Sequence, residues 1–362
     1  MVYALPDPLP WAHLAGPLTA AEDALARLDE RLGASPIREG WISRTHFADA
    51  CASLWLAGEL VHLEDLVLHD VGMDVRRPTH ELTRAHAVLH TRRRIAVAHP
   101  AWSISPSGLS ALCHDKQRAE REPAALASAT RREEEGEGAF ADDTFAAELA
   151  AVDAVLARSE EVLAGAAPAR ERDPLLYDLD WDEGERLDEW RRVLNETRSL
   201  PSLLAAALAL DAWQVIEPLQ HRPWLGSLLV AGLLRARSKA RHHLPCIDLA
   251  LKQLPRERRR ARDATTRVVA FLEGVTLGAE QGLKDHDRWV LSRGLMARKL
   301  AGRRKHSKLP ALIELVLARP LISAGMIAAE LRVTPRAAQD LVAELGLREM
   351  TGRSRYRAWG VL

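Results

Sequence analysis

The chain has 362 residues, 47% of them hydrophobic, which is enough to bury a large core and suggests two or three domains. Its three cysteines, Cys51, Cys113 and Cys246, lie far apart, which argues against a disulfide framework or a zinc ribbon. The N-terminus lacks a basic, apolar signal region, and no later run of about 18 apolar residues could span a bilayer. We therefore expect a cytoplasmic protein that is neither secreted nor inserted in a membrane.

The formal net charge of zero hides a charge difference along the chain. Between residues 298 and 362 there are 13 arginines and lysines against 5 aspartates and glutamates, a net charge of +8. The first 297 residues therefore carry a net charge of −8. A polyanion such as DNA would bind at the basic end.

Apolar residues recur at helical spacing along most of the chain, and alternating, strand-like runs are nearly absent. Alanine, leucine, arginine and glutamate, which all favour helices, are abundant. These features predict an all-α body. Residues 1–115 form its N-terminal helical segment. Residues 116–143 are charged and poor in aromatic residues, so we predict a mobile linker there.

A central helical bundle with a basic connector is predicted for residues 144–305. Its expected helices cover 144–163, 182–196, 200–217, 223–237 and a stretch from 255 towards 305, with a break near residues 278–282. The arginine-rich run at 256–262 has two open interpretations. It extends a DNA-binding surface, or it forms ion pairs with the acidic body.

Residues 306–362 have the pattern of a winged helix-turn-helix. Apolar positions predict a first helix over 309–318, which ends before Pro320 because proline cannot continue it. Ser323 can cap a second helix that reaches Leu331. A short turn and a third helix follow, at the spacing of a DNA-binding motif.

The third helix has clear start and stop signals. Thr334 is an N-cap, Pro335 suits the first helical position, and Gly346 ends the helix. Its apolar positions form one stripe that we expect to be buried: Ala338, Leu341, Val342 and Leu345.

A two-stranded hairpin follows the third helix and forms the wing. Its strands are expected at 347–350 and 355–359, around a turn at 351–354. Tyr356 and Trp359 are expected to anchor one side of the second strand to the helices, while arginines occupy the other side.

Eight polar residues make up the predicted DNA interface: Thr334, Arg336, Gln339, Asp340, Arg348, Arg353, Arg355 and Arg357. Arg336 and Gln339 are expected to face outward, and these residue types pair bidentately with guanine and adenine in the major groove. The wing arginines would contact phosphate or enter the minor groove. We therefore predict a homodimer that binds double-stranded DNA at an inverted repeat. The alternative of a winged helix that contacts only protein stays open.

Three stretches carry a family resemblance: ASPIREG at 34–40, SLWLAGELVHLEDL at 53–66 and LGLREMTGR at 345–353. With them, the whole chain resembles an uncharacterised family of alphaproteobacterial proteins, many from rhizobial plasmids. Its members pair a domain of unknown function with a C-terminal helix-turn-helix. The resemblance implies DNA binding. Because many members come from rhizobial plasmids, it also suggests a repressor of plasmid or symbiosis-type genes. It implies no particular effector.

The order of parts is also similar to that of Fic-type proteins, which transfer AMP to a hydroxyl with a loop of the form HPFxxGNGRxxR. The nearest stretch, 221–229, begins with His221 but lacks the acidic residue, the Asn-Gly pair and the loop arginine. Residues 35–40 fit the short S-x-x-x-E-G pattern of the Fic inhibitory helix, a pattern that arises easily by chance. We expect a degenerate Fic-like body with no enzymatic activity and no cofactor. A Fic-like AMP transferase with a remodelled loop is the alternative.

Two groups of residues could bind zinc or manganese. The first comprises His62, Glu64, Asp65, His69 and Asp70, and the second is the i, i+4 pair of His86 and His90. Neither has an HExxH motif or a visible partner cluster, and a solvated or hydrogen-bonded helix face is the commoner explanation. The sequence therefore predicts no metal site.

Overall fold

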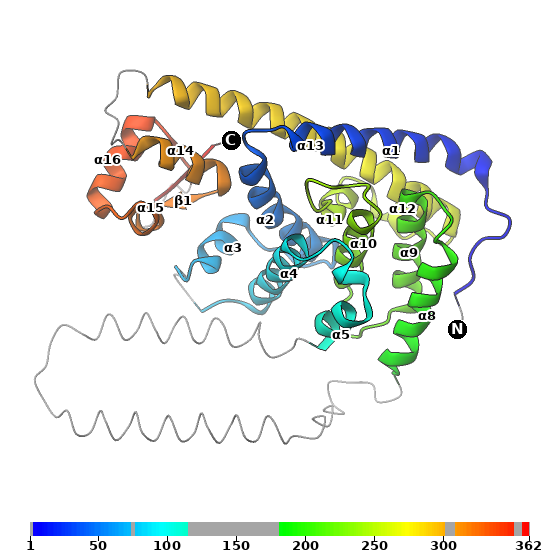
Figure 1. Ribbon diagram of the computed structural model, residues 1–362. Helices are drawn as coiled ribbons and strands as arrows, with labels where there is room; N and C mark the ends of the chain where they lie inside the picture. Colours follow the sequence, from blue (N-terminus) through cyan, green and yellow to red (C-terminus); the bar gives the residue numbers. More distant parts are fainter. Residues whose placement is uncertain (1–2, 74–76, 115–180, 301–307, 351–356, 362) are drawn as a thin grey trace, which may run out of the picture. The chain divides into compact units, whose positions relative to one another are not determined.

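The computed structural model describes residues 3–73, 77–114, 181–300, 308–350 and 357–361. The predicted linker at 116–143 and the predicted helix at 144–163 lie outside the described residues. The described residues of 3–114 and 184–361 belong to one compact unit. Its body is helical and its small sheet lies near the C-terminus, which confirms the predicted fold class (Figure 1).

The described part of the body consists of helices. They are α1 (Trp11–Gly33), α2 (Arg38–Leu56), α3 (Leu63–Asp70), α4 (His80–Val97), the 3₁₀ helix η1 (Trp102–Ile104), α5 (Pro106–His114), α8 (Glu183–Glu196), α9 (Ser202–Ile216), α10 (Leu225–Ala236), α11 (Ile247–Leu251), α12 (Arg256–Arg259) and α13 (Ala264–Arg298). The helices predicted at 182–196, 200–217 and 223–237 are confirmed as α8, α9 and α10. Apolar periodicity was sufficient to find them because each buries an apolar face in the same core.

The predicted break near residues 278–282 is wrong, because α13 is continuous through both glycines. A glycine inside a helix costs about 1 kcal/mol relative to alanine. Here the missing side chains let other helices approach. A Cβ atom at Gly278 would lie 2.6 Å from the Cβ of Ala250 on α11, and one at Gly282 would lie 3.0 Å from Cδ2 of Leu28 on α1. Close packing with α1 and α11 therefore stabilises the unbroken helix.

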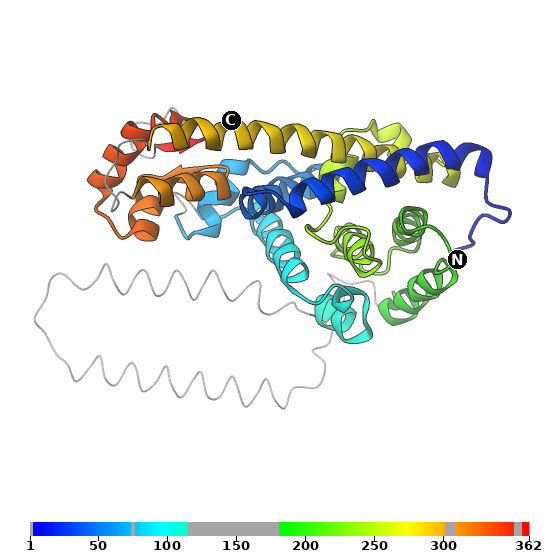
Figure 2. The ribbon, with the colours of Figure 1, turned by 45° about the horizontal axis from the view of Figure 1, so that its top comes forward.

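The N-terminal helices and the central helices share one hydrophobic core. Helix α1 lies along α13 in both ribbon views (Figures 1 and 2). The indole Nε1 of Trp41 on α2 donates to the carbonyl of Gly282 on α13 over 3.2 Å. The hydroxyl of Tyr3 donates to the carboxylate of Asp211 on α9 over 2.8 Å. Residues far apart in the sequence thus complete the same core.

A buried ion pair lies in this core. The guanidinium of Arg92 on α4 is fully buried and donates to Oδ2 of Asp49 on α2 over 2.7 Å. It also donates to Nδ1 of His46 over 3.0 Å and to the carbonyls of Leu244 and Pro245 over 2.7 and 3.1 Å. Every nitrogen of this guanidinium therefore has a partner inside the protein, as burial of a charge requires.

The C-terminal module is a winged helix-turn-helix. Its elements are α14 (Leu309–Ala318), β1 (Ile322–Ser323), α15 (Ala324–Leu331), α16 (Pro335–Leu345), β2 (Arg348–Glu349) and β3 (Ala358–Gly360). The three helices are confirmed, and each predicted wing strand overlaps an observed one, β2 within 347–350 and β3 at the end of 355–359. Strand β1 was not predicted, because it has only two residues and forms by pairing with β3, with Ile322 opposite Trp359. The sheet order is β1-β3-β2, antiparallel throughout.

Candidate nucleic-acid interface

Helix α16 begins and ends through the local interactions that its sequence predicts. The hydroxyl of Thr334 accepts a hydrogen bond from the amide of Ala337 over 3.2 Å, and Pro335 occupies the first turn. Gly346 ends the helix with φ +66°, in the left-handed region that glycine adopts at little cost. The expected apolar stripe is buried, except that Leu341 is half-buried.

The opposite face of α16 is open to solvent. Arg336, Gln339 and Asp340 are exposed there, and Thr334 is exposed at the start of the helix. Arg336 and Gln339 are three residues apart, so their side chains project from the same side of the helix. The described part of the chain offers neither side chain a hydrogen bond or an ion pair. Both are therefore available to an external partner.

The turn between α15 and α16 contains a basic residue that the sequence interpretation did not select. Arg332 ends α15 in the left-handed conformation, with φ +52°, and its side chain is exposed. The following amide, that of Val333, donates to the carbonyl of Ala328 over 3.1 Å and closes the turn. A charged residue directly before the N-cap of the third helix was the signal that could have identified it.

The described wing residues are basic and partly paired. Arg348 on β2 is exposed, as is Arg357 just before β3. Arg357 donates from Nε and Nη2 to one carboxylate oxygen of Glu349 over 2.8 and 2.5 Å. Arg353 and Arg355 lie outside the described residues, as does Tyr356.

One prediction about the wing is wrong. Trp359 is buried as expected, with 6% of its surface exposed, but Arg357 is not on the opposite side of the strand. Its guanidinium carbon lies 5.9 Å from the centre of the Trp359 ring. The reason is the period of a strand, which places residues two apart on the same face.

Arg44 on α2 attaches the winged helix to the body. Its Nη1 donates to the carbonyl of Val316 on α14 over 3.1 Å, and its Nη2 donates to the carbonyl of Val361 over 2.8 Å. Its guanidinium also lies 4.7 Å from the centre of the Trp289 ring on α13. Burial, and secondarily Arg288, lowers the pKa of Arg44 to about 10, so it stays positively charged at neutral pH.

A second contact links α13 to the end of α16. The ammonium group of Lys299, directly after α13, donates to the carbonyl of Leu345 over 2.6 Å. A cation at the C-terminus of a helix is favourable because it neutralises the unpaired carbonyls and the negative end of the helix dipole. The body thus holds α16 at its C-terminal end and leaves the exposed face free.

The arginine-rich run at 256–262 has features of both open interpretations, an extended DNA-binding surface and ion pairs with the body. Arg258 forms an ion pair with Glu273 over 2.5 Å, and Nε of Arg259 donates to the carbonyl of Leu254 over 3.1 Å. Arg256 and Arg260 are exposed. Part of the run therefore pairs within the body, and part remains accessible.

Residues next to His221, in the stretch compared with the Fic loop, hold neighbouring helices together. Nη1 of Arg222 donates to the carbonyl of Leu112 over 2.8 Å. The carbonyl of Pro223 accepts a hydrogen bond from Nε1 of Trp213 over 3.0 Å. These contacts hold α5 and α9 against the start of α10, and they assign no chemistry to His221.

The structure brings together only some residues of the two groups that could bind a metal ion. Asp70, at the end of α3, lies beside His86 on α4, and His90 lies one turn further along α4. His69 is buried with its ring 4.7 Å from that of His86, centre to centre. His62 and Asp65 are exposed and are not part of this cluster.

Two family models match parts of this chain. Residues 309–362 match the family model of a helix-turn-helix DNA-binding domain, and residues 175–301 match that of a protein of unknown function, DUF1612. Neither match is to a Fic-type protein. None of the described helices has the length and apolar character needed to cross a membrane.

The chain is also similar over nearly its full length to the uncharacterised protein y4cF of Sinorhizobium fredii (strain NBRC 101917 / NGR234). The two are 51% identical over 368 residues, and the match covers 96% of each chain. The chain therefore belongs to the same family as this rhizobial protein, and in it a region of unknown function precedes a C-terminal helix-turn-helix DNA-binding domain.

Proposed function

We propose that this protein is a cytoplasmic, sequence-specific regulator of transcription that binds double-stranded DNA through α16 and the wing. The observation that carries the proposal is the exposed, uncommitted pair of Arg336 and Gln339 on a helix whose other face is buried. A guanidinium and a carboxamide in this position can read guanine and adenine, respectively, in the major groove. Asp340, one residue further, can accept a hydrogen bond from cytosine.

The remaining contacts would fix the module on the DNA backbone. Thr334 lies at the N-terminus of α16, where a hydroxyl and free amides favour a phosphate. Arg348 and Arg357 present charge on the wing, and Arg332 presents it at the turn. Phosphate contacts of this kind set orientation and affinity but carry no sequence information directly.

We propose a homodimer on an inverted repeat, because a two-fold protein matches a two-fold site. An exposed apolar face on the C-terminal half of α13 supports it. Leu291 and Leu295 are four residues apart, with 63% and 50% of their surfaces exposed. Sedimentation should show a dimer for the wild type and a monomer for the Leu291→Glu, Leu295→Glu double variant. A monomeric wild type would contradict this arrangement.

The decisive experiment selects bound fragments from genomic DNA and then measures affinity for matched and mismatched sites. Truncating Arg336 or Gln339 to alanine should cost about 1 to 3 kcal/mol at its own base pair and reduce discrimination there. Arg198→Ala, which removes an exposed arginine after α8, is the charge-matched control and should bind as the wild type does. If Arg336→Ala and Gln339→Ala both keep the full preference, α16 does not read the sequence.

Two other functions are distinguished by simple results. A winged helix that contacts only protein would show no salt-sensitive DNA affinity. A Fic-like transferase would move label from ATP to itself or to other proteins, and the label would disappear in His221→Ala. We propose no enzymatic activity, and we expect no labelling.

A further inference from the structure

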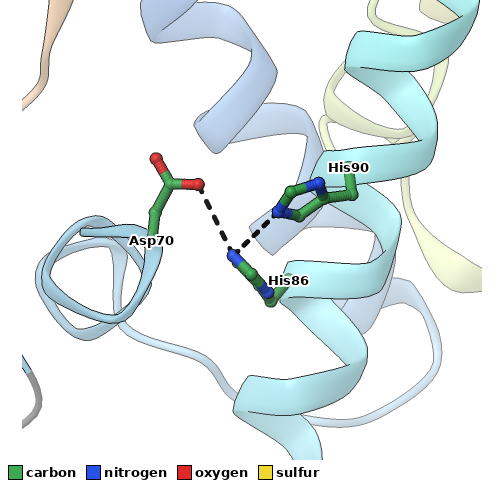
Figure 3. A group of neighbouring side chains, drawn as sticks. All are labelled: Asp70, His86 and His90. Atoms are coloured by element: carbon green, nitrogen blue, oxygen red, sulfur yellow. Dashed lines mark hydrogen bonds and ion pairs between the residues drawn. The ribbon is translucent and has the colours of Figure 1, made fainter. Parts of the chain in front are cut away.

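Two histidines and a carboxylate converge between α3 and α4 (Figure 3). Nε2 of His86 lies 3.2 Å from Nε2 of His90 and 3.5 Å from Oδ1 of Asp70. All three ligand atoms lie within 4.8 Å of one another. The side chains of Asp70 and His86 are only 8% and 12% exposed.

Hydrogen bonds alone satisfy the polar atoms of Asp70, His86 and His90 poorly. Nε2 of a neutral histidine has either one proton or one lone pair, and Nε2 of His86 faces two partners at once. If it donates to Asp70, it cannot also bond well to His90. If it instead accepts from His90, its lone pair faces the negative carboxylate. A cation between the three atoms would interact favourably with all of them.

We propose that Asp70, His86 and His90 bind one divalent transition-metal ion, and that zinc is the ion that fits best. With metal–ligand bonds of about 2.0–2.1 Å, a tetrahedral zinc site separates its ligand atoms by about 3.3 Å. The two short separations here, 3.2 and 3.5 Å, lie on either side of that value. Three protein ligands leave the fourth position to water or to an exchangeable ligand.

Neighbouring side chains hold the cluster in this geometry. Arg93 donates to both oxygens of Asp70, over 2.6 and 3.0 Å, which fixes the plane of the carboxylate. A carboxylate has about four lone-pair sites, so Oδ1 can still bind a metal ion. The ring of His69 packs edge-on against that of His86.

The cluster is connected to α15, the second helix of the winged helix-turn-helix. The amide of Met73 donates to the carbonyl of Leu68 over 2.9 Å and ties this residue to the end of α3. The hydroxyl of Ser323, which caps α15, lies 3.4 Å from the sulfur of Met73. A Cβ atom at Gly325 would lie 2.8 Å from Cε of Met73. A metal ion that restrains α3 against α4 would thereby act on the start of α15.

The regulatory part of this inference, which rests on the proposed function, is that metal binding changes DNA affinity. The two sites are distinct, and Met73 is the contact through which one can bias the other. The metal site itself does not depend on DNA binding and is tested separately.

Calorimetric titration of the tag-free, chelator-treated full chain with Zn²⁺ tests the site. We expect one ion per chain. His86→Gln and His90→Gln should each weaken Zn²⁺ binding by at least about 100-fold. Substitution of residues that only hydrogen-bond to the ligands of a metal site already lowers metal affinity about 10–100-fold. His80→Gln, at the exposed start of α4, is the control and should bind as the wild type does. Absence of Zn²⁺ binding, or equal binding by the His90→Gln protein with an unchanged circular dichroism spectrum, would overturn the site.

DNA affinity measured with and without Zn²⁺ tests the coupling. In the wild type the ion should change the affinity by at least about 5-fold, the lower end of typical coupling between sites. His90→Gln should abolish the change. Met73→Ala should also abolish it while keeping the Zn²⁺ affinity. A wild type that binds Zn²⁺ and DNA independently would refute the regulatory role, and a chain that binds Zn²⁺ but no DNA would refute the proposed function.

Discussion

Arg92 in the body and Arg336 in the winged module use the same side chain in opposite ways. Arg92 is fully buried, with Asp49, a histidine nitrogen and two carbonyls as partners. Arg336 is exposed on α16, and no described side chain or carbonyl accepts from its guanidinium. A guanidinium whose donors are all used inside the protein contributes to the fold. One whose donors face solvent can bind another molecule.

Arg44 lies between these two extremes. It belongs to the body and is buried, but its acceptors are backbone carbonyls of the winged helix. It therefore positions the module and does not contact DNA in our proposal. The comparison teaches that burial and the choice of acceptor decide the role of an arginine in a protein in which arginine is abundant.

The largest expected effect is a loss of stability on breaking the buried ion pair of Arg92 and Asp49. Arg92→Met leaves the carboxylate of Asp49 without its cation, although the amide of Leu249 still donates to it over 2.8 Å. Removing one member of a buried ion pair costs about 3–5 kcal/mol. Urea unfolding followed by circular dichroism should show this loss, whereas Arg336→Ala should change stability by less than about 0.5 kcal/mol. Equal stabilities of the two variants would contradict the distinction between an arginine that stabilises the fold and one that is free to bind another molecule.

The second prediction concerns a carboxylate beside the same network. Burial, and then the negative charge of Asp49, raises the pKa of Asp248 from 3.8 to about 7. A carboxyl group that holds its proton more tightly when folded favours the folded state at low pH. The contribution of Asp248 to stability should therefore decline, by up to about 1.4 kcal/mol per pH unit, as the pH rises from about 4 towards 7.

Urea unfolding at several pH values checks this sign. Between pH 5 and pH 7 the stability of Asp248→Asn should fall less, or rise more, than that of the wild type, because the titrating group is gone. Asp188→Asn, an exposed aspartate on α8, is the control and should follow the wild type. A steeper decline in Asp248→Asn would show that the assignment is wrong.

The third prediction concerns the turn of the helix-turn-helix. Arg332 has φ +52°, a conformation that costs a side chain with a Cβ atom roughly 1 to 2 kcal/mol. Arg332→Gly should therefore stabilise the chain by about 1 kcal/mol, less the entropy that glycine adds to the unfolded state. Thermal unfolding measures the gain. A destabilised variant would mean that the Arg332 side chain supports the turn.

The smallest effect is expected at the wing. Arg357 already pairs with Glu349, so an ion pair competes with any phosphate contact. Arg357→Ala should weaken binding to all DNA sequences similarly. It should also reduce the slope of log affinity against log salt concentration by roughly one. Titrations at several salt concentrations measure this slope, with Arg336→Ala as the variant that should change sequence preference instead. Loss of preference in Arg357→Ala would assign sequence reading to the wing.

The sequence predicted the winged helix well because its signals are local. Thr334, Pro335 and Gly346 act on the backbone within a turn of their own position, so their effect needs no distant partner. The exposure of Arg336 and Gln339 followed from the 3.6-residue period of the same helix. Where a prediction depended on distant partners it failed: β1 needed β3, and the continuity of α13 needed α1 and α11.

The sequence by itself thus determined the all-α class, the positions of α8, α9 and α10 to within two residues, and the extent of α16 with its outward side chains. Only the tertiary structure decided which distant residues meet. It joined Arg92 to Asp49 and Arg44 to the backbone of the winged helix, and it brought Asp70 to the histidine pair on α4. The physical reason is that periodicity and capping specify single elements, whereas these contacts depend on how packed helices place side chains from different elements at bonding distance.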